Sequence, residues 1–208
     1  MYTPKYFEVQ DSELILEFIK NHSFGTLLSS TKDFPIATHL PLDVYTEQGH
    51  TYLSGHFAYA NPHWKLLIEN PQVLVTFLGP HAYVSSSWYA QENVPTWNYV
   101  SVHVYGTAQL VEGEELALML AKMLKKYEQG RNNGVLWDTL DPKFLKQEMK
   151  GIVGFKVKIE KIEASFKLSQ NRNNEDYKSI INNLKNENDV SAIEVANWME
   201  KMRPMNEN

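Results

Sequence analysis

The strongest constraint on the fold is a long stretch, residues 98–112 (NYVSVHVYGTAQLVE), in which apolar and polar residues alternate. Valine, glycine, alanine or leucine occupies every second position from Val100 to Leu110, and mostly polar residues lie between them. Successive side chains of a β-strand point to opposite faces, so this pattern predicts a strand with one apolar and one polar face. His103 falls on the polar face, where a hydrogen-bonded or half-exposed histidine is the ordinary outcome.

Further segments rich in β-branched, aromatic and leucine residues predict additional strands, separated by turn residues. They cover residues 24–30, 36–42, 51–57, 73–78, 82–86 and 151–162. Residues 46–49 (TEQG) are expected to form a hairpin loop, and Gly79-Pro80 is expected to end one strand before the next begins. Roughly six or seven antiparallel strands without a regular strand–helix alternation predict a mainly β fold, a closed or nearly closed barrel with peripheral helices.

Apolar residues at helical spacing predict helices at about residues 12–22, 62–69, 114–129, 176–184 and 191–202. Asn61 and Pro62 would begin the second of these, because Asn is a favoured N-cap and Pro is favoured at the first helical position. We expect residues 1–172 to form the barrel domain. Residues 173–208 are expected to form a C-terminal helical appendage that packs on the barrel or on a dimer partner.

Composition excludes several classes of function. The chain has 208 residues, a formal net charge of −5 and no cysteine, so thiol chemistry and cysteine-ligated zinc are excluded. No nucleotide-binding glycine motif, serine nucleophile elbow or paired-carboxylate motif occurs. No signal peptide and no apolar run long enough for a membrane span is present, so we expect a cytoplasmic protein without membrane contact. The acidic balance argues against broad nucleic-acid binding.

Two histidines and several aromatic residues lie close together in residues 55–65 (GHFAYANPHWK). His56 and His63 are separated by the Asn61-Pro62 corner and have no partner at metal-ligand spacing, so we expect no metal site. His63 is expected on the surface of the helix that follows. The residues alone assign no catalytic role, because a general base needs a partner that spacing does not identify.

Two other polar segments leave alternatives open. Residues 85–89 (SSSWY) and 93–99 (NVPTWNY) interleave tryptophan and tyrosine with hydroxyl and amide groups, which suits either a planar ligand or a protein interface. Residues 166–172 (FKLSQNR) could hold a phosphate by charge and hydrogen bonds. They could equally form a solvated connector that caps the next helix through Asn173 or Asn174, and the residues alone favour the connector.

An ordered set of motifs resembles the PaiB family, described as FMN-binding negative transcriptional regulators linked with repression of sporulation and of degradative-enzyme (protease) production. The motifs are ATHLPL, GHFAYANPHW, GPHAYVSSSWY, NVPTWNYVSVHVYG, KGIVGF and KLSQNR, and the resemblance extends from the N-terminus to about residue 185. It implies an antiparallel split β-barrel of the FMN-binding, pyridoxamine-phosphate-oxidase-like class. It also implies that flavin lies at the interface of a homodimer.

The resemblance also implies a set of cofactor-binding residues. One strand, residues 36–42 with Thr38 and His39, would run beside the flavin ring. The phosphate would lie near the corner before the second helix, where a helix N-terminus also favours an anion. The full set implied is Thr38, His39, Ser54, His56, Asn61, Lys65, Thr76, Trp88, Thr96, Trp97, Asn98, Lys167 and Arg172. Some family members carry Arg where Tyr59 stands, so here the phosphate would depend on Lys65, Lys167, Arg172 or backbone donors.

The function that follows is that of an FMN-binding repressor rather than an enzyme. The alternative is a flavin-dependent reductase or oxidase acting on a small substrate. DNA or a regulatory protein is a possible partner. The tail after Asn173 carries more acidic than basic residues, which suits DNA contact poorly, so it is expected to pack against the rest of the protein.

Overall fold

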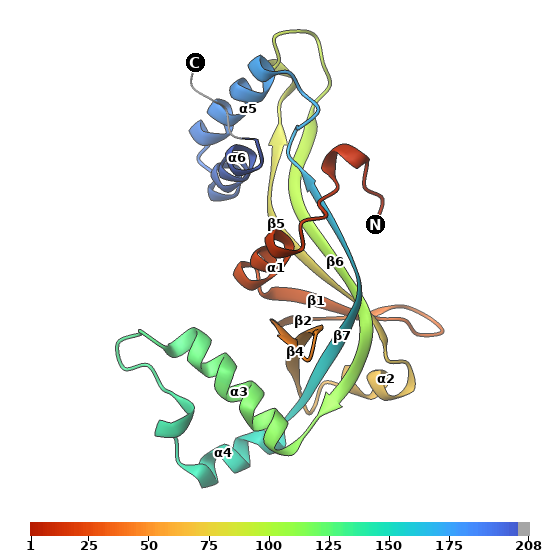
Figure 1. Cartoon of the computed structure of the whole chain (residues 1–208), viewed down its shortest axis with the longest axis vertical. Helices are drawn as coiled ribbons and strands as arrows, with labels where there is room; N and C mark the ends of the chain where they lie inside the picture. Colours follow the sequence, from red (N-terminus) through yellow and green to blue (C-terminus); the bar gives the residue numbers. More distant parts are fainter. Residues whose placement is uncertain (204–208) are drawn as a thin grey trace. The chain divides into compact units, whose positions relative to one another are not determined.

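The computed structural model describes residues 1–203 and contains one seven-stranded sheet in the order β2-β1-β5-β6-β7-β4-β3. The ladders β1–β2, β1–β5, β3–β4 and β4–β7 are antiparallel. The strands are β1 Phe24–Ser29, β2 Ile36–Pro41, β3 Asp43–Glu47, β4 His50–Ala58, β5 Gln72–Val84, β6 Thr96–Val111 and β7 Ile152–Lys167. The mainly β fold with peripheral helices is confirmed (Figure 1).

The helices are α1 Ser12–Asn21, α2 His63–Glu69, α3 Gly113–Glu128, α4 Pro142–Glu148, α5 Asn174–Asn186 and α6 Val190–Met202. Four short 3-10 turns accompany them, η1 Lys5–Phe7, η2 Ser86–Trp88, η3 Trp137–Thr139 and η4 Met149–Gly151. In the part of the chain that the structure describes, no helix combines the length and the apolar character that a membrane crossing requires.

The chain divides into two compact units, each described separately below. The terminal unit consists of Met1–Glu17, Phe77–His103 and Glu163–Asn208, the last described through Arg203. The central unit consists of Phe18–Thr76 and Val104–Ile162. Strands β5, β6 and β7 contribute residues to both units.

The central unit contains β1 to β4 and a core of large apolar side chains. Leu27, Leu53, Val75 and Phe155 have no exposed surface, and Phe57 packs on Phe155 with ring centroids 4.8 Å apart. Residues of alternate parity on the strands supply this core, as a two-residue side-chain period requires. Burying an aromatic or aliphatic side chain of this size contributes about 1.5–3 kcal/mol, so this core accounts for much of the stability of the unit.

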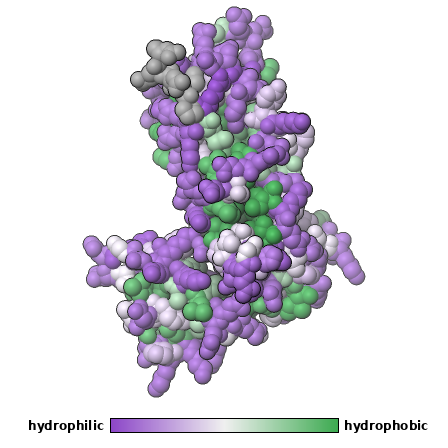
Figure 2. All heavy atoms as spheres, in the orientation of Figure 1, coloured by the Kyte–Doolittle hydropathy of each residue, from purple (hydrophilic) through white to green (hydrophobic). Residues whose placement is uncertain are grey.

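A segment with α3 and α4 is inserted between β6 and β7 in the central unit (Figure 1). Leu116 and Leu120 of α3 are buried with Val111, and a ring of partly buried residues packs against them, namely Met119, Met123, Trp137, Met149 and Ile152. Hydrophobic side chains still reach the surface over this segment (Figure 2), and Leu118 and Phe144 are among the exposed ones. The α3–α4 segment therefore forms a small hydrophobic core together with the adjoining ends of β6 and β7.

In the terminal unit, α5 and α6 pack side by side (Figure 1). The hydroxyl of Tyr177 donates to the carbonyl of Met199 over 2.8 Å, and burial raises the pKa of Tyr177 to about 12. Ser179 donates a hydrogen bond to the carbonyl of Trp88 over 2.7 Å, which joins α5 to η2. Asn173 caps α5, because its side chain accepts from the backbone N–H of Asp176.

Most of the predicted elements are confirmed, and four details are wrong. Helix α2 begins at His63 with Pro62 as its N-cap, so Asn61 is not the N-cap and Pro62 is not the first helical residue. The strand at residues 98–112 and the helices near residues 12–22 and 114–129 are present as β6, α1 and α3. Gly79-Pro80 does not interrupt β5; β1 pairs with β5 only through Thr76, so Pro80 lies beyond that ladder, where a missing N–H is tolerated. Strand β3 and helix α4 were not predicted.

Candidate functional site

A row of polar residues crosses three strands on one face of the central unit. In the strand register, Thr26 of β1 lies opposite His39 of β2 and opposite Thr76 of β5. The Thr26 hydroxyl and His39 Nδ1 are hydrogen-bonded over 2.8 Å. Phe24, 68% exposed, stacks on the His39 ring with centroids 6.5 Å apart. The register therefore brings two of the residues implied by the resemblance, His39 and Thr76, onto one accessible face.

Thr38 lies on the opposite face of β2, since neighbouring residues of a strand point to opposite sides. Its hydroxyl is 2.7 Å from Nδ1 of His63, and the Asn61 amide donates to the same hydroxyl over 3.3 Å. The backbone N–H of His63 donates to Oδ1 of Asn61 over 3.0 Å, which fixes the orientation of that amide. We call Thr38, Asn61 and His63 the histidine network. It joins an outer strand of the sheet to the corner before α2.

The prediction that His63 lies on the helix surface is wrong. Its side chain is 1% exposed, and its ring packs against Phe57 with centroids 5.3 Å apart. Burial lowers the pKa of His63, so the neutral imidazole is the favoured form at pH 7. The first residue of α2 points toward the sheet, a direction that the spacing of a short helix does not reveal.

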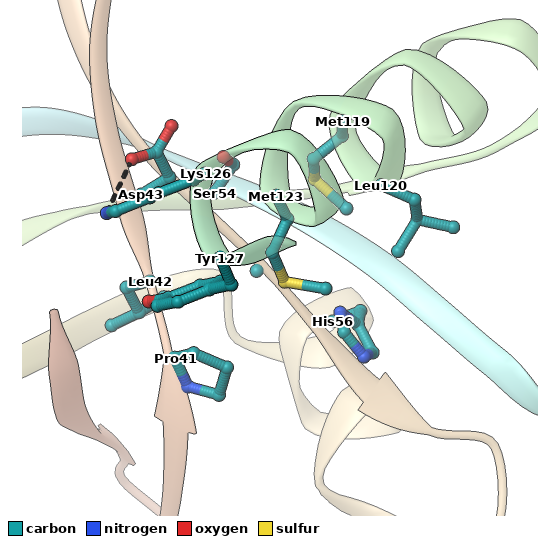
Figure 3. A pocket seen from close by; sticks show the side chains of 11 residues that line it. Pro41, Leu42, Asp43, Ser54, His56, Met119, Leu120, Met123, Lys126 and Tyr127 are labelled. Atoms are coloured by element: carbon teal, nitrogen blue, oxygen red, sulfur yellow. Dashed lines mark hydrogen bonds and ion pairs between the residues drawn. The ribbon is translucent and has the colours of Figure 1, made fainter. Parts of the chain in front are cut away.

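Ser54 and His56 lie under α3, apart from the histidine network. They line a small cavity with Met119 and Met123, and Figure 3 shows these side chains among those that line it. The cavity volume is about 10 Å³, which is about enough for one water molecule. Nδ1 of His56 is buried without a hydrogen-bond partner, and burial lowers the pKa of this histidine. Phe57, the next residue of β4, points to the opposite face and contacts His63.

Lys65 and Tyr59 flank the corner at Asn61. Lys65 is exposed, and its ammonium lies 5.6 Å from the ring centroid of Trp64. The indole N–H of Trp64 donates to the carbonyl of Tyr59 over 3.0 Å. Tyr59 and Trp64 line an open groove of about 370 Å³, to which Lys146 and Lys150 also contribute. The positive charges near Tyr59 therefore include two lysines that the sequence did not single out.

In the terminal unit, Lys167 and Arg172 are brought together by a turn after β7. Nζ of Lys167 donates to the hydroxyl of Thr96 over 2.6 Å. The guanidinium of Arg172 lies 4.7 Å from the ring centroid of Tyr89 and donates to Oδ1 of Asn93 over 3.4 Å. Burial, together with the positive charge of Arg172, lowers the pKa of Lys167. These contacts hold two cationic side chains close enough to repel each other.

The aromatic residues of the terminal unit differ in accessibility. Trp97 is 52% exposed, and its ring lies near those of His81 and Tyr83, at centroid distances of 5.8 Å and 6.1 Å. Trp88 is half-buried in η2. Asn98 has no exposed surface, and its amide bonds to Ser169 and to the sulfur of Met199. Trp97 is therefore open to a ligand or a partner, whereas Asn98 is used inside the unit.

The structure also identifies residues that the sequence did not single out as candidates. Thr26, His63 and Asn93 each make a direct hydrogen bond to a residue implied by the resemblance. The strand register links Thr26 to His39, and such a register is not written in local composition. Asn93 lies in residues 93–99, which the sequence indicated as suited to a planar ligand or an interface, but its contact with Arg172 was not predicted.

The chain matches known proteins along most of its length. Residues 1–161 match the model of a family described as "Putative FMN-binding domain". The chain is 54% identical over 200 residues to "Protease synthase and sporulation protein PAI 2" of Bacillus subtilis, covering 96% of this chain and 97% of that one. It is 30% identical over 160 residues to an uncharacterized protein of Saccharomyces cerevisiae, covering 64% of this chain and 94% of that one.

Solved structures show the same fold. The FAD and heme binding protein from Mycobacterium smegmatis matches with a TM-score of 0.60 at 14% identity, covering 77% of this chain and 73% of that one. The flavocytochrome Anf3 from Azotobacter vinelandii matches with a TM-score of 0.60 at 19% identity, covering 85% of this chain and 78% of that one. These likenesses confirm the split-barrel fold. The sequence matches show that this chain belongs to the family of the Bacillus subtilis protein, the PaiB family of FMN-binding-domain proteins.

Proposed function

We propose that this protein binds FMN and acts as a negative regulator of transcription that limits sporulation and protease production. The observation that carries the proposal is the 54% identity to the Bacillus subtilis sporulation protein along nearly the whole of both chains. The family match over residues 1–161 supports the flavin part of the proposal. The regulatory part depends on the name of the relative, so the two parts are tested separately.

The residues of the central unit have the chemistry that a flavin ring requires. The row of Thr26, His39 and Thr76 offers hydroxyl and imidazole groups on an accessible face, and Phe24 supplies an exposed ring beside them. Flat ligands are held by such mixtures of aromatic contact and a few polar groups. When bound, FMN would supply redox chemistry, and the residues of the row would bind and orient its ring.

The other residues implied by the resemblance receive roles according to their accessibility. In the central unit, Lys65 would offer a positive charge from the corner before α2, and Thr38 and Asn61 would support that corner through the histidine network. Ser54 and His56 would act through their packing under α3, because the cavity that they share, about 10 Å³, and the second pocket that Ser54 lines, about 90 Å³, are both too small for a flavin. In the terminal unit, exposed Trp97, half-buried Trp88 and the side chains around Lys167 would contact ligand, while buried Asn98 would support them.

We propose further that the protein is a homodimer. Exposed aromatic side chains of the terminal unit support this, because Trp97 and Tyr83 form an accessible cluster of the kind enriched at interfaces. The tail helices would act structurally rather than on DNA: Ser191 of α6 exchanges two hydrogen bonds with the backbone of His81. The partner through which transcription changes would then be DNA contacted elsewhere on the protein, or a regulatory protein.

Flavin binding is tested by the absorbance spectrum of the purified protein and by thermal shift with added FMN. We expect flavin bands, or a rise in the unfolding midpoint that depends on FMN concentration, because a ligand that binds only the folded state stabilises it. The variant Thr76→Ile changes the polar row without introducing charge, and Thr46→Ile on β3 is a matched control outside the row. A colourless protein that FMN does not stabilise would contradict the flavin proposal.

Regulation is tested by deleting the gene in its host and measuring secreted protease and spore counts. We expect both to rise, and complementation with the wild-type gene to restore them. A gel shift with salt titration then separates direct DNA contact from an indirect effect, because phosphate contacts weaken steeply with salt. Unchanged protease and spore counts in the deletion strain would contradict the regulatory proposal while leaving flavin binding intact.

A further inference from the structure

The turn after β7 has a fixed shape that places Arg172 beside the end of the strand. Ser169 has a φ of 61°, and the backbone N–H of Arg172 donates to the Ser169 carbonyl over 3.0 Å. The Gln170 side chain bridges the turn, since it accepts from the N–H of Leu168 over 2.8 Å and donates to the carbonyl of Phe166 over 2.5 Å. The turn therefore constrains the positions from which Lys167 and Arg172 extend.

The two cations of this turn have only neutral hydrogen-bond acceptors. Lys167 donates to the Thr96 hydroxyl and Arg172 to the Asn93 amide oxygen, and neither makes an ion pair within residues 1–203. Other lysines of the chain do have carboxylate partners, as Lys126, Lys156, Lys185 and Lys201 show. Half-buried charges are costly unless they are paired, so this pair has unused capacity for an anion.

Two acidic residues lie in the first turn of α5, of which Glu175 is exposed and Asp176 is already engaged. Asp176 is buried, and its carboxylate accepts from the Asn173 side chain and from the backbone N–H of Ala90, each over 2.9 Å. The pKa of Lys167 is lowered by burial and by Arg172, and no carboxylate raises it. Neither Lys167 nor Arg172 makes an ion pair with a carboxylate within residues 1–203, so their side-chain hydrogen bonds leave the two positive charges unbalanced.

We propose that Lys167 and Arg172 form a binding site for a phosphate monoester, with the hydroxyl of Thr96 and the amide of Asn93 beside it. Arg172 supplies a planar set of N–H donors already positioned by Tyr89, and Lys167 supplies a compact charge. A dianionic phosphate matches two cations in charge. The proposal deepens the proposed function where the ester is the phosphate of FMN, but a free phosphate or another phosphorylated small molecule has the same chemistry.

The experiment compares three probes, FMN, riboflavin and inorganic phosphate, on the full-length wild type and on Lys167→Met and Arg172→Met. Calorimetry gives the affinities, and thermal shift gives the effect of each probe on folding. We expect each variant to weaken FMN at least about tenfold, because a charge-assisted hydrogen bond is lost. Riboflavin, which lacks the phosphate, should bind wild type more weakly than FMN and be unaffected by the variants. Inorganic phosphate should compete with FMN and raise the unfolding midpoint of wild type only.

Two further variants separate charge from folding. Lys178→Met removes an exposed lysine of α5 in the same unit and should leave all three probes unchanged. Lys167→Arg keeps the positive charge and should restore most of the FMN affinity that Lys167→Met loses. Circular dichroism of each variant identifies any that fail to fold. If Lys167→Met does not fold, the FMN affinity of Lys167→Arg shows whether a positive charge at this position is sufficient for binding, and an affinity far below that of wild type would contradict the proposal.

The outcomes distinguish this inference from the proposed function. If FMN and riboflavin bind equally well and the variants change neither, flavin binding stands and the phosphate site is overturned. If no flavin binds but inorganic phosphate stabilises wild type and not Lys167→Met, the flavin proposal fails and the anion site stands. If neither FMN nor inorganic phosphate shifts the midpoint of wild type, the anion site is overturned.

Discussion

The histidine network of the central unit and the cation pair of the terminal unit, Lys167 and Arg172, differ in the hydrogen-bond partners of their polar side chains. Both place polar side chains in half-buried or buried surroundings. In the network, the neutral groups of Thr38, Asn61 and His63 bond to one another. In the cation pair, Lys167 and Arg172 bond only to a hydroxyl and an amide, and neither has a counter-ion within residues 1–203.

The difference separates a structural role from a binding role. Thr38, Asn61 and His63 find hydrogen-bond partners in one another, although Nε2 of His63 is buried without a partner, and removing one member leaves further polar groups unpaired. A cation pair without a carboxylate leaves part of its interaction for a ligand. Stability should therefore respond strongly to changes in the network, and ligand affinity should respond strongly to changes in the pair.

The largest effect on stability is expected from Thr38→Val, which keeps the shape of the side chain and removes the hydroxyl. Nδ1 of His63 and the amide of Asn61 would both lose their partner. A buried polar group left unpaired costs about 1–3 kcal/mol, and His63 is buried whereas Asn61 is half-buried, so we expect the free energy of unfolding to fall by about 1–3 kcal/mol. Urea denaturation monitored by circular dichroism measures the change.

Thr46→Val serves as the control, because Thr46 lies on β3 with an exposed side chain. It should change the free energy of unfolding by less than about 0.5 kcal/mol, as surface substitutions usually do. Equal effects of the two substitutions would show that the histidine network contributes no more to the free energy of unfolding than a single exposed threonine does. That result would contradict a structural role for the network.

The next effect concerns pH. Burial lowers the pKa of His63 below its ordinary value of 6.5. At any pH between the lowered pKa and 6.5, the unfolded chain therefore binds more protons than the folded chain. The neutral histidine therefore contributes stability above about pH 6.5, and that contribution is lost as the pH falls through 6.5 toward the lowered pKa. One such site changes stability by at most about 1.4 kcal/mol per pH unit. Denaturation curves between pH 7.5 and 5 should be flatter for His63→Asn than for wild type.

His56 and His103 provide the internal comparison, because burial also lowers the pKa of each. Wild type should retain a pH dependence from all three histidines, and His63→Asn should remove only one part of it. His56→Asn should remove another part, and the double substitution should flatten the curve most. A pH dependence unchanged by His63→Asn would mean that folding does not change the pKa of His63, which would contradict the prediction.

The sequence predicted those parts of the fold that depend on local pattern. Two-residue alternation identified β6, and apolar residues at helical spacing identified α3. Strand β3 was missed because its residues include part of an expected loop, and pairing with β4 makes it a strand. The strand break predicted at Gly79-Pro80 is wrong. A strand tolerates Pro where no neighbouring strand needs its N–H, and the pairing of strands cannot be seen in the local sequence.

The sequence predicted which residues belong to the candidate site, but it did not predict which of them lie together in the fold. Motif resemblance supplied Thr38 and His39 together, yet strand geometry sends them to opposite faces, where they contact His63 and Thr26. The prediction placed His63 on the helix surface, because nothing in the local sequence indicates which way a side chain at the start of a short helix points. For residues 166–172, charge suggested a phosphate site and Asn173 suggested a cap; the cap is confirmed, while the phosphate site remains a proposal.

The smallest effect on stability is expected from Lys167→Met measured without any anion. The substitution removes one hydrogen bond to Thr96, but it also removes the repulsion between Lys167 and Arg172, and the methionine can cover apolar surface as the lysine stem does. These contributions oppose each other, so the free energy of unfolding should stay within about 0.5 kcal/mol of wild type. Urea denaturation in a phosphate-free buffer measures it, alongside Thr38→Val. Adding inorganic phosphate should then stabilise wild type and leave Lys167→Met unchanged, since only wild type keeps both cations. If Lys167→Met costs more than about 2 kcal/mol without phosphate, Lys167 is a structural residue like Thr38, and the two regions do not differ in the way their hydrogen bonds suggest.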